Sequence, residues 1–418
     1  MKDKAIKALN ITVGVVFLLW LTTQVVLVIR LWGGWYYSDA ANYIRFAQEV
    51  VEASSWYPTT SQFYNNLWIA NTGYINFLAL NLRIFGSFSQ VGLIQILLNV
   101  ILLWGVYRLT CKLTCETVGK LSVILFCILP SNIMNAPAIL SDLLCMALII
   151  PSMSIMKRNC AVLFIAGVLM VLGNWVRPIA IIFLPSIVIY AIWVKTKFKY
   201  YLAYGAGMAV IYCLILSFTW NSCGYALGGS TTKGTNMIIG CWNGADGGYS
   251  QEVFKEGNPG YIENSEHINA VEKDKILTIR SVEWIISNPG KFLKLIPRKL
   301  GQLWGADVYS DKVYLSEDEA LTMKQRVLFS IPYYLILILA AIGLWINRRA
   351  IIGVCGLVLL PIILGSGMHI LMYGGLRYHY PMMPSVIFLS ALGLYYLIKK
   401  KSVLRGMTHQ RTDSIGCK

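Results

Sequence analysis

The sequence predicts an all-α polytopic membrane protein with about ten transmembrane helices, juxtamembrane helices on the outer face and one large outer loop. Hydrophobic residues make up 56% of the 418-residue chain and charged residues only 13%. The apolar residues recur in runs of about 17–22, the length that a helix needs to cross a bilayer. Short basic connectors separate these runs, as in membrane proteins with a defined orientation.

Ten apolar runs are candidate spans. They cover about 12–30, 89–107, 120–137, 141–156, 160–175, 178–194, 201–219, 327–346, 350–371 and 380–398. The first run follows Lys2, Lys4 and Lys7 and is too long for the apolar part of a signal peptide. Because no small-residue cleavage site precedes Arg30, we expect this run to be a retained first span.

The net charge of +16 reports topology. The surplus Lys and Arg lie in the connectors, with clusters at 2–7, 108–120, 157–158, 195–199, 348–349 and 399–401. All of these fall on one side when ten spans are drawn, which predicts that both termini are cytoplasmic. The long loop 220–326 is nearly neutral, with 12 Lys/Arg against 13 Asp/Glu. The charge therefore predicts contact with membrane lipids and no nucleic-acid partner.

Residues 67–86 are almost apolar enough to form an eleventh span. An eleventh crossing would place the later basic clusters on the outer side, against the charge rule. Polar residues also interrupt the run, namely Asn71, Asn76, Asn81 and Arg83. We therefore expect shallow or re-entrant helices within a first outer loop, 31–88.

The expected organisation has four parts. They are a transmembrane catalytic module at 1–219, the large outer loop 220–326, C-terminal transmembrane helices at 327–398 and a basic cytoplasmic tail at 399–418. In the large loop, the glycine-rich stretch 224–248 predicts turns and a mobile segment. Helical periodicity follows at 265–286 and ends at Asn288-Pro289-Gly290, before an amphipathic surface helix at 291–303.

Several kinds of chemistry lack their motifs. The chain has no phosphate loop, dinucleotide fingerprint, serine-hydrolase elbow or His-x-x-x-His pair. Its ten cysteines show no metal-ligand spacing; only Cys223 and Cys241 share the large loop, where a disulfide and two buried thiols are both open. We expect any reaction to take place on the outer face, with a substrate that arrives in the membrane.

Two carboxylates are the candidate catalytic groups, Asp39 and Asp142. Of 20 acidic residues, 13 lie in 220–326, whereas these two stand at the outer edges of apolar segments, where a charge is costly. Both begin predicted helices, so the helix dipole would keep them ionised and able to accept a proton. Asp is also a favoured N-cap, with Ser38 and Ser141 as alternative caps, so a structural role stays open.

The candidate substrate-binding residues on that face are basic and aromatic. Arg177 lies between the fifth and sixth spans, and Arg377, Tyr378 and His379 lie between the last two. Arginine binds phosphate through a planar fork, although Arg177 equally suits snorkelling to lipid headgroups and His379 a structural hydrogen bond. Aromatic residues of the first outer loop predict an interfacial belt, of which some could stack on a sugar: Trp35, Tyr36, Tyr37, Trp56, Tyr57 and Tyr64.

In this order, these residues resemble the C-class membrane glycosyltransferases, and most closely glycosyltransferase family 39, which includes protein O-mannosyltransferases and aminoarabinose transferases. The resemblance covers roughly 10–195 and 370–398. It rests on Asp39 with Tyr43, Gly73-Tyr74 through Gly86, Tyr107-Arg108-Leu109, Leu140-Ser141-Asp142, Val176-Arg177-Pro178 and Arg377-Tyr378-His379-Tyr380-Pro381. Two features differ: the family's Asp-Glu pair is Asp39-Ala40 here, and its juxtamembrane proline is absent near Asn71.

The resemblance implies a C-class fold and an inverting transfer of a hexose or pentose. The donor would be a polyprenyl-phosphate sugar, and the acceptor a glycan, lipid or protein at the outer face. Asp39 inherits the role of base, and the second acid is carried onto Asp142. Tyr43, Arg177, Arg377, Tyr378 and His379 would bind substrate. The resemblance requires no metal, although two acids on one face could hold a divalent cation.

Two alternatives stay open. A lipid-linked polysaccharide polymerase or ligase would depend on Arg and His in the large loop. A flippase or transporter would need charges in mid-span and an internal repeat, which the sequence does not contain. The compact, Lys-rich chain is typical of bacteria, so we expect an inner or plasma membrane protein of the cell envelope.

Overall fold

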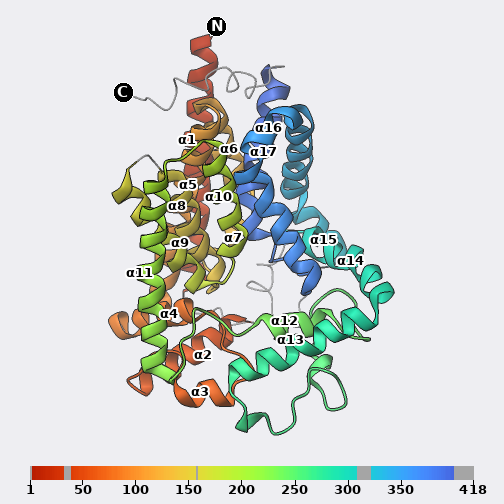
Figure 1. Ribbon diagram of the computed structural model, residues 1–418. Helices are drawn as coiled ribbons and strands as arrows, with labels where there is room; N and C mark the ends of the chain where they lie inside the picture. Colours follow the sequence, from red (N-terminus) through yellow and green to blue (C-terminus); the bar gives the residue numbers. More distant parts are fainter. Residues whose placement is uncertain (1, 33–38, 157–158, 308–321, 400–418) are drawn as a thin grey trace.

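The computed structural model describes residues 2–32, 39–156, 159–307 and 322–399 (Figure 1). Within these ranges the chain forms helices and connecting loops, with no β-strand. The start of α1 (Lys2–Arg30) and the end of α17 (Met383–Lys399) lie at one end of an upright bundle (Figure 1). The opposite end, formed by α2–α4 and α12–α14, is called the loop end below.

The bundle contains the apolar helices α1, α5 (Ser89–Leu113), α6 (Glu116–Ile128), α7 (Pro130–Met134), α8 (Ser141–Ile155), α9 (Cys160–Val176), η1 (Ala180–Ile182), α10 (Leu184–Trp193), α11 (Phe198–Cys223), α16 (Ile331–Leu371) and α17. The loop end contains α2 (Asp39–Glu52), α3 (Thr60–Asn65), α4 (Thr72–Phe85), α12 (Lys233–Gly240), η2 (Glu252–Phe254), η3 (Ser265–His267), α13 (Ala270–Ser287) and α14 (Pro289–Trp304). The short α15 (Met323–Phe329) precedes α16, and η5 (Tyr380–Met382) precedes α17.

Five helical segments in the described residues are long and apolar enough to cross a membrane. They are Ile6–Arg30, Ser89–Leu113, Phe198–Cys223, Ile331–Arg348 and Tyr380–Lys399. Shorter apolar helices lie at Ser141–Ile155, Cys160–Val176, Ala180–Trp193 and Leu357–Leu371. The segment expected as one span at 120–137 is divided between α6 and α7 at Pro130, whose nitrogen has no hydrogen to donate. Helices therefore occupy all ten predicted segments, while the number of crossings stays a prediction.

The long element α16 doubles back on itself. Trp304 Nε1 donates to Ser366 Oγ at 3.2 Å, and the Trp304 carbonyl accepts from the Tyr333 hydroxyl at 3.0 Å. A straight helix would separate Tyr333 from Ser366 by about 50 Å, at 1.5 Å per residue. The first and second halves of α16 thus run side by side. The start of the first half, at Tyr333, and the end of the second half, at Ser366, both contact the end of α14 at Trp304.

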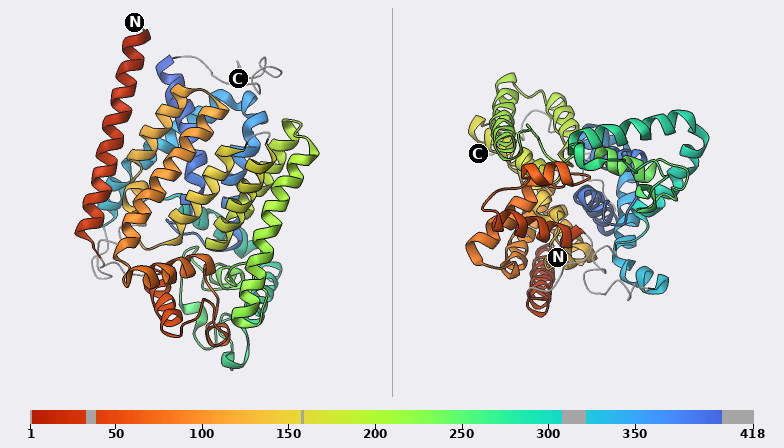
Figure 2. Two further views of the ribbon diagram at one scale, coloured as in Figure 1. Left: turned by 90° about the vertical axis from the view of Figure 1, so that its left-hand side faces the viewer. Right: turned by 90° about the horizontal axis from the view of Figure 1, so that it is seen from below.

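Glycines allow the closest helix crossings of the bundle. A Cβ added to Gly343 of α16 would collide with the Leu389 carbonyl of α17, and one added to Gly393 with the Leu339 carbonyl. Small residues permit such backbone contacts, which matter in lipid because hydrophobic burial drives helices together only weakly there. Helices α1 and α11 instead stand at opposite edges of the bundle (Figure 2, left), and little of either is buried in the molecule.

The first outer loop contains α2 and α4, which lie side by side at the loop end (Figure 1). The buried face of α2 includes Tyr43, Phe46, Ala47 and Val50, which recur at helical spacing. Lys273 of α13 connects the large outer loop to the first outer loop. Its ammonium donates hydrogen bonds to the carbonyls of Tyr64 and Asn66.

The large outer loop has more regular structure than its glycine content suggests. Its glycine-rich start, expected as turns, contains α12, whose apolar side joins a small core of Ile238, Ile239, Val253, Ile262, Leu277 and Tyr373. Burial of the Ile238-Ile239 pair outweighs the low helix propensity of glycine in this segment. The helix end expected at 288–290 is present and is followed at once by the next helix. Asn288 caps the end of α13, and Pro289 is the first residue of α14. Cys223 and Cys241 are both free and buried.

Candidate active site

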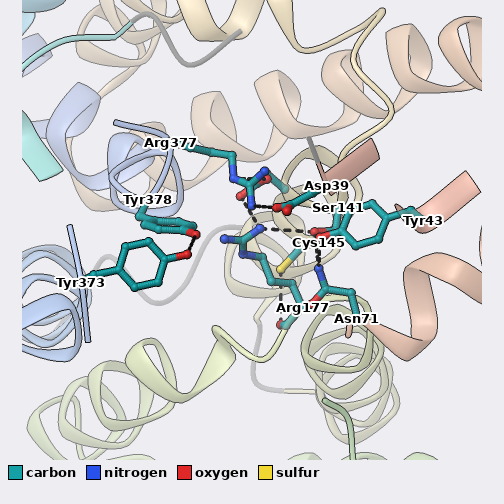
Figure 3. A network of polar contacts seen from close by, with 10 residues as sticks. Asp39, Tyr43, Asn71, Ser141, Cys145, Arg177, Tyr373, Arg377 and Tyr378 are labelled. Carbon is teal, nitrogen blue, oxygen red and sulfur yellow. Dashed lines mark hydrogen bonds and ion pairs between the residues drawn. The ribbon is translucent and has the colours of Figure 1, made fainter. Parts of the chain in front are cut away.

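The first and last parts of the chain meet at an ion pair between Asp39 and Arg377 (Figure 3). Asp39 opens α2, and Arg377 lies in the loop between α16 and α17, 338 residues away along the chain. A guanidinium Nη2 of Arg377 donates to Asp39 Oδ2. The Asp39 side chain stays 39% exposed, whereas that of Arg377 is 15% exposed. This pair therefore presents an accessible carboxylate backed by a largely buried cation.

The second acid, Asp142, lies behind the first and is 1% exposed. Its Oδ1 is 3.0 Å from Arg177 Nη1, and its Oδ2 is 3.8 Å from Arg377 Nε. Arg377 thus lies between the two carboxylates. Two acids and two arginines balance in charge, which offsets part of the large cost of removing them from water.

The helix ends place each charge where the backbone favours it. Asp39 and Asp142 lie in the first turns of α2 and α8, near the positive end of the helix dipole. Arg177 is the C-cap of α9, near the negative end of that helix. The N-cap position of α8 is Leu140, without a side-chain cap bond, and Ser141 bonds elsewhere. The capping alternative for Ser141 and Asp142 is therefore not what the structure contains.

Asn71 connects the elements that carry the two acids. Its Nδ2 donates to the Tyr43 hydroxyl at 2.7 Å and to Ser141 Oγ at 2.9 Å, and Arg177 Nη1 reaches the same Oγ at 3.3 Å. Asn71 has φ +25°, in the left-handed region that few residues other than glycine adopt. In the sequence, Asn71 stands out only as a polar interruption of an apolar run. The signal that was available is that Asn both tolerates positive φ and commonly precedes helices.

Tyr378 lies on the other side of the arginines (Figure 3). Its ring centroid is 5.5 Å from Arg177 Cζ and 5.4 Å from Arg377 Cζ. Its hydroxyl is hydrogen-bonded to that of Tyr373, and its ring stacks on His369 with 4.8 Å between the centroids. Tyr378 thus flanks both cations with an electron-rich face, which favours a guanidinium held there.

Electrostatics keep the accessible acid ionised. Burial raises the pKa of Asp39, but the Arg377 and Arg177 guanidiniums lower it by more, so that it lies below the ordinary value of 3.8. Burial, and then the Asp39 charge, raise the pKa of Tyr43, so its hydroxyl keeps its proton. The cluster can therefore accept a proton at Asp39 and hold an anion at Arg377 and Arg177.

His379 lies outside this cluster. Its ring is fully buried, with Nδ1 2.9 Å from the Leu303 carbonyl and Nε2 3.2 Å from Asp307 Oδ1. Asp307 Oδ2 accepts from the Ser131 backbone N–H at 2.9 Å. Of the seven residues expected to form the site, the structure brings together Asp39, Tyr43, Asp142, Arg177, Arg377 and Tyr378. The ring nitrogens of His379 face α14 and Asp307 instead.

The residues between the two acids do not fit a divalent cation. No group of three His, Cys, Asp or Glu converges anywhere in the described part of the chain. The position between Asp39 and Asp142 that a metal ion would take is filled by the Arg377 guanidinium. The positive charge at this site is therefore supplied by arginine.

Comparison with known proteins identifies the fold. No protein-family model and no curated protein sequence matches the chain. Two crystal structures of the Archaeoglobus fulgidus oligosaccharyltransferase do match. The one tethered with an acceptor peptide containing the NVT sequon is 14% identical, with TM-score 0.51, over 97% of this chain and 51% of that one. The one in complex with Zn and sulfate is 13% identical, with TM-score 0.51, over 96% and 50%.

This likeness concerns the fold alone, because the identity is low. It supports the C-class architecture that the sequence predicts and does not distinguish family 39 within that class. The chain spans about half the length of the oligosaccharyltransferase. Its own activity is therefore argued from the site.

Proposed function

We propose that the chain is a membrane glycosyltransferase that moves a sugar from a polyprenyl-phosphate donor to an acceptor at the outer face of the membrane. The observation that carries the proposal is the contact between Asp39 and Arg377, a proton acceptor and an anion-binding group in one accessible place. The fold shared with an oligosaccharyltransferase supports it. The proposed orientation has the loop end outside and both termini in the cytoplasm, in agreement with the basic connectors.

The donor phosphate would be held by the two arginines. A guanidinium pairs with phosphate oxygens through parallel hydrogen bonds and stays charged at every relevant pH. Arg377 and Arg177 are largely buried, so their attraction for an anion is weakly screened by water. As the bond from the sugar to the phosphate breaks, the charge that develops on the phosphate would be stabilised in place, without a proton donor.

Asp39 is the base in this proposal, and Asp142 positions the arginines. Only Asp39 is open to an incoming acceptor, because Asp142 is 1% exposed and faces both guanidiniums. The acceptor hydroxyl or amine attacks the anomeric carbon, its proton goes to Asp39, and the electron pair of the breaking bond leaves on the phosphate. One displacement of this kind inverts the anomeric centre.

Donor binding would also prepare the base. Arg377 holds the pKa of Asp39 low, which makes the carboxylate a weak base in the free protein. A bound phosphate competes for the same guanidinium and places a negative charge nearby, and both effects raise the pKa of Asp39. The acid therefore gains basicity when the donor is in place, which favours an ordered reaction with the donor first.

A transfer assay in proteoliposomes tests the proposal. Purified protein is given a labelled polyprenyl-phosphate sugar and a panel of glycan, lipid and peptide acceptors. We expect transfer by the wild-type chain and by Glu52→Gln, a control at the exposed far end of α2, and none by Asp39→Asn. Normal transfer by Asp39→Asn would contradict the assignment. Movement of the lipid across the vesicle without sugar transfer would point to a flippase.

A further inference from the structure

The large outer loop is seated directly on the segment that carries Arg377. The Gly374 N–H donates to the Gly247 carbonyl at 2.9 Å. A Cβ added to Gly240 would collide with the Met372 carbonyl, and one added to Gly374 with the Lys299 carbonyl. Gly247 has φ +104°, which only glycine adopts readily. Residues 240–248 are thus held backbone to backbone against 372–374, a few residues before Arg377.

This fixed loop presents one exposed aromatic ring, that of Tyr249. Asp246 Oδ1 accepts from the Gly248 N–H at 2.8 Å, which closes a tight turn just before Tyr249. The Tyr249 ring packs on that of Tyr373, with 5.6 Å between the centroids. Tyr373 is buried, whereas Tyr249 is 54% exposed. Tyr249 is therefore held in place on one side and open on the other.

A continuous series of ring contacts joins Tyr249 to the catalytic cluster. Tyr373 lies 5.4 Å from Tyr378, measured between ring centroids, and the two hydroxyls are hydrogen-bonded (Figure 3). The Tyr378 ring then lies against Arg377, the partner of Asp39. Two ring-to-ring steps separate the exposed platform from the residue that flanks both arginines, a span that a short saccharide can bridge.

We propose that Tyr249 is a platform for a saccharide acceptor. One sugar unit of the acceptor packs on the Tyr249 ring, and the adjacent unit presents a hydroxyl to Asp39. The inference rests on the proposed function and names its acceptor class. The C–H face of a sugar ring is apolar and packs on an aromatic face, while its hydroxyls need nearby polar groups. Asp246, three residues earlier on the same loop, is exposed and would supply one of them.

Steady-state kinetics with a series of short oligosaccharides and a series of peptides tests the inference. For Tyr249→Ala we expect the KM for the saccharide to rise about three- to tenfold, the range of one aromatic contact. The donor KM and the kcat at saturating acceptor should stay unchanged. Tyr249→Phe should behave as the wild type, because the ring and not the hydroxyl makes the contact. The matched control is Tyr261→Ala, an exposed tyrosine of the same outer loop outside the ring series.

A binding measurement separates this inference from the proposed function. Saturation-transfer NMR records saccharide binding to the protein in nanodiscs without any donor. Loss of the signal in Tyr249→Ala, but not in Tyr261→Ala, supports the platform even if no sugar is ever transferred. An unchanged saccharide KM and NMR signal in Tyr249→Ala would overturn the inference and leave the proposed function standing. A preference for peptides that Tyr249→Ala does not affect would overturn it as well.

Discussion

Two clusters that contain buried acids lie near the loop end, and they differ in whether an acidic side chain is exposed. In the first, Asp39 and Asp142 face Arg377 and Arg177, and Asp39 remains 39% exposed. In the second, the side chains of Asp307 and His379 are both fully buried, and each Asp307 oxygen has a hydrogen-bond partner. A buried acid is common to both. The cluster that can act on a substrate is distinguished by one accessible acid.

The second cluster acts as a staple between distant segments. Asp307 follows α14 and bonds to Ser131 of α7 and Ser330 before α16, while His379 precedes α17. In the first cluster, by contrast, neither oxygen of Asp142 makes an aligned hydrogen bond within the described residues, and charge alone holds it. We infer that the first cluster can exchange its partners, whereas the second cannot do so without unfolding.

The largest expected effect is on turnover in Asp39→Asn. The change removes the proton acceptor and keeps the size of the side chain, so kcat should fall about 100- to 10,000-fold. The melting temperature should stay close to that of the wild type, because Arg377 keeps Asp142 as a partner. The two quantities are measured by the transfer assay and by thermal unfolding in detergent. If Asp39→Asn loses stability but keeps its kcat, the first cluster would be structural and not catalytic.

Asp307→Asn should lower the stability and leave kcat nearly unchanged. Asn keeps only one of the two acceptor oxygens of Asp307, so one buried hydrogen bond is lost, which costs about 1–3 kcal/mol of stability. The kcat per folded molecule should stay within about twofold of the wild type, since this pair lies away from the acids. Unfolding is followed in denaturant, with Glu256→Gln, an exposed acid of the same large loop, as the control. A loss of turnover without a loss of stability would mean that Asp307 belongs to the active site.

A smaller effect is expected at Asn71. Asn71→Ala removes two hydrogen bonds and leaves the Tyr43 and Ser141 hydroxyls without this donor, at a cost of about 1–3 kcal/mol. We expect kcat to fall roughly tenfold, with the donor KM little changed, because the two acids lose their relative position. Asn71→Gly is the matched variant, since glycine accepts the positive φ but has no amide. If glycine restores turnover, the role of Asn71 lies in its backbone.

The smallest effect is a displacement of the pH profile. Ionised Asp39 is required, so activity should fall as the pH drops through its pKa, which in the wild type is below 3.8. Arg377→Gln removes the main group that lowers this pKa and leaves burial, which raises it. The acidic limb of kcat/KM for the donor, which reports the free protein, should therefore move to higher pH. Arg177→Gln should move it less, and equal limbs in all three proteins would remove Asp39 from the base role.

The helices and the grouping of most candidate site residues could be predicted because each depends on a pattern along the chain. Apolar runs gave the helices, and the basic connectors placed Asp39, Asp142, Arg177 and Arg377 on one side. Pairing of particular atoms has no such pattern. Asp307 is one of 13 acids in the large loop, and its burial depends on contacts with α7 and α16.

Backbone geometry and ring direction were also beyond the sequence. The role of Asn71 depends on a left-handed turn, which one polar residue before a helix does not determine. His379 follows the Arg377-Tyr378 pair directly and stands just before the 3₁₀ turn at 380–382, yet its ring faces Leu303 and Asp307. Neighbours in sequence thus serve different clusters.

The union of Asp39 with Arg377 has a consequence for biogenesis. Asp39 follows α1 and Arg377 precedes α17, and the two residues are 338 positions apart. A chain still emerging from the ribosome, or one that stalls during insertion, holds an acid without its arginine. The pair can form only after the loop between α16 and α17 has been made. Under the proposed function, a shorter chain would leave the lipid-linked sugar untouched.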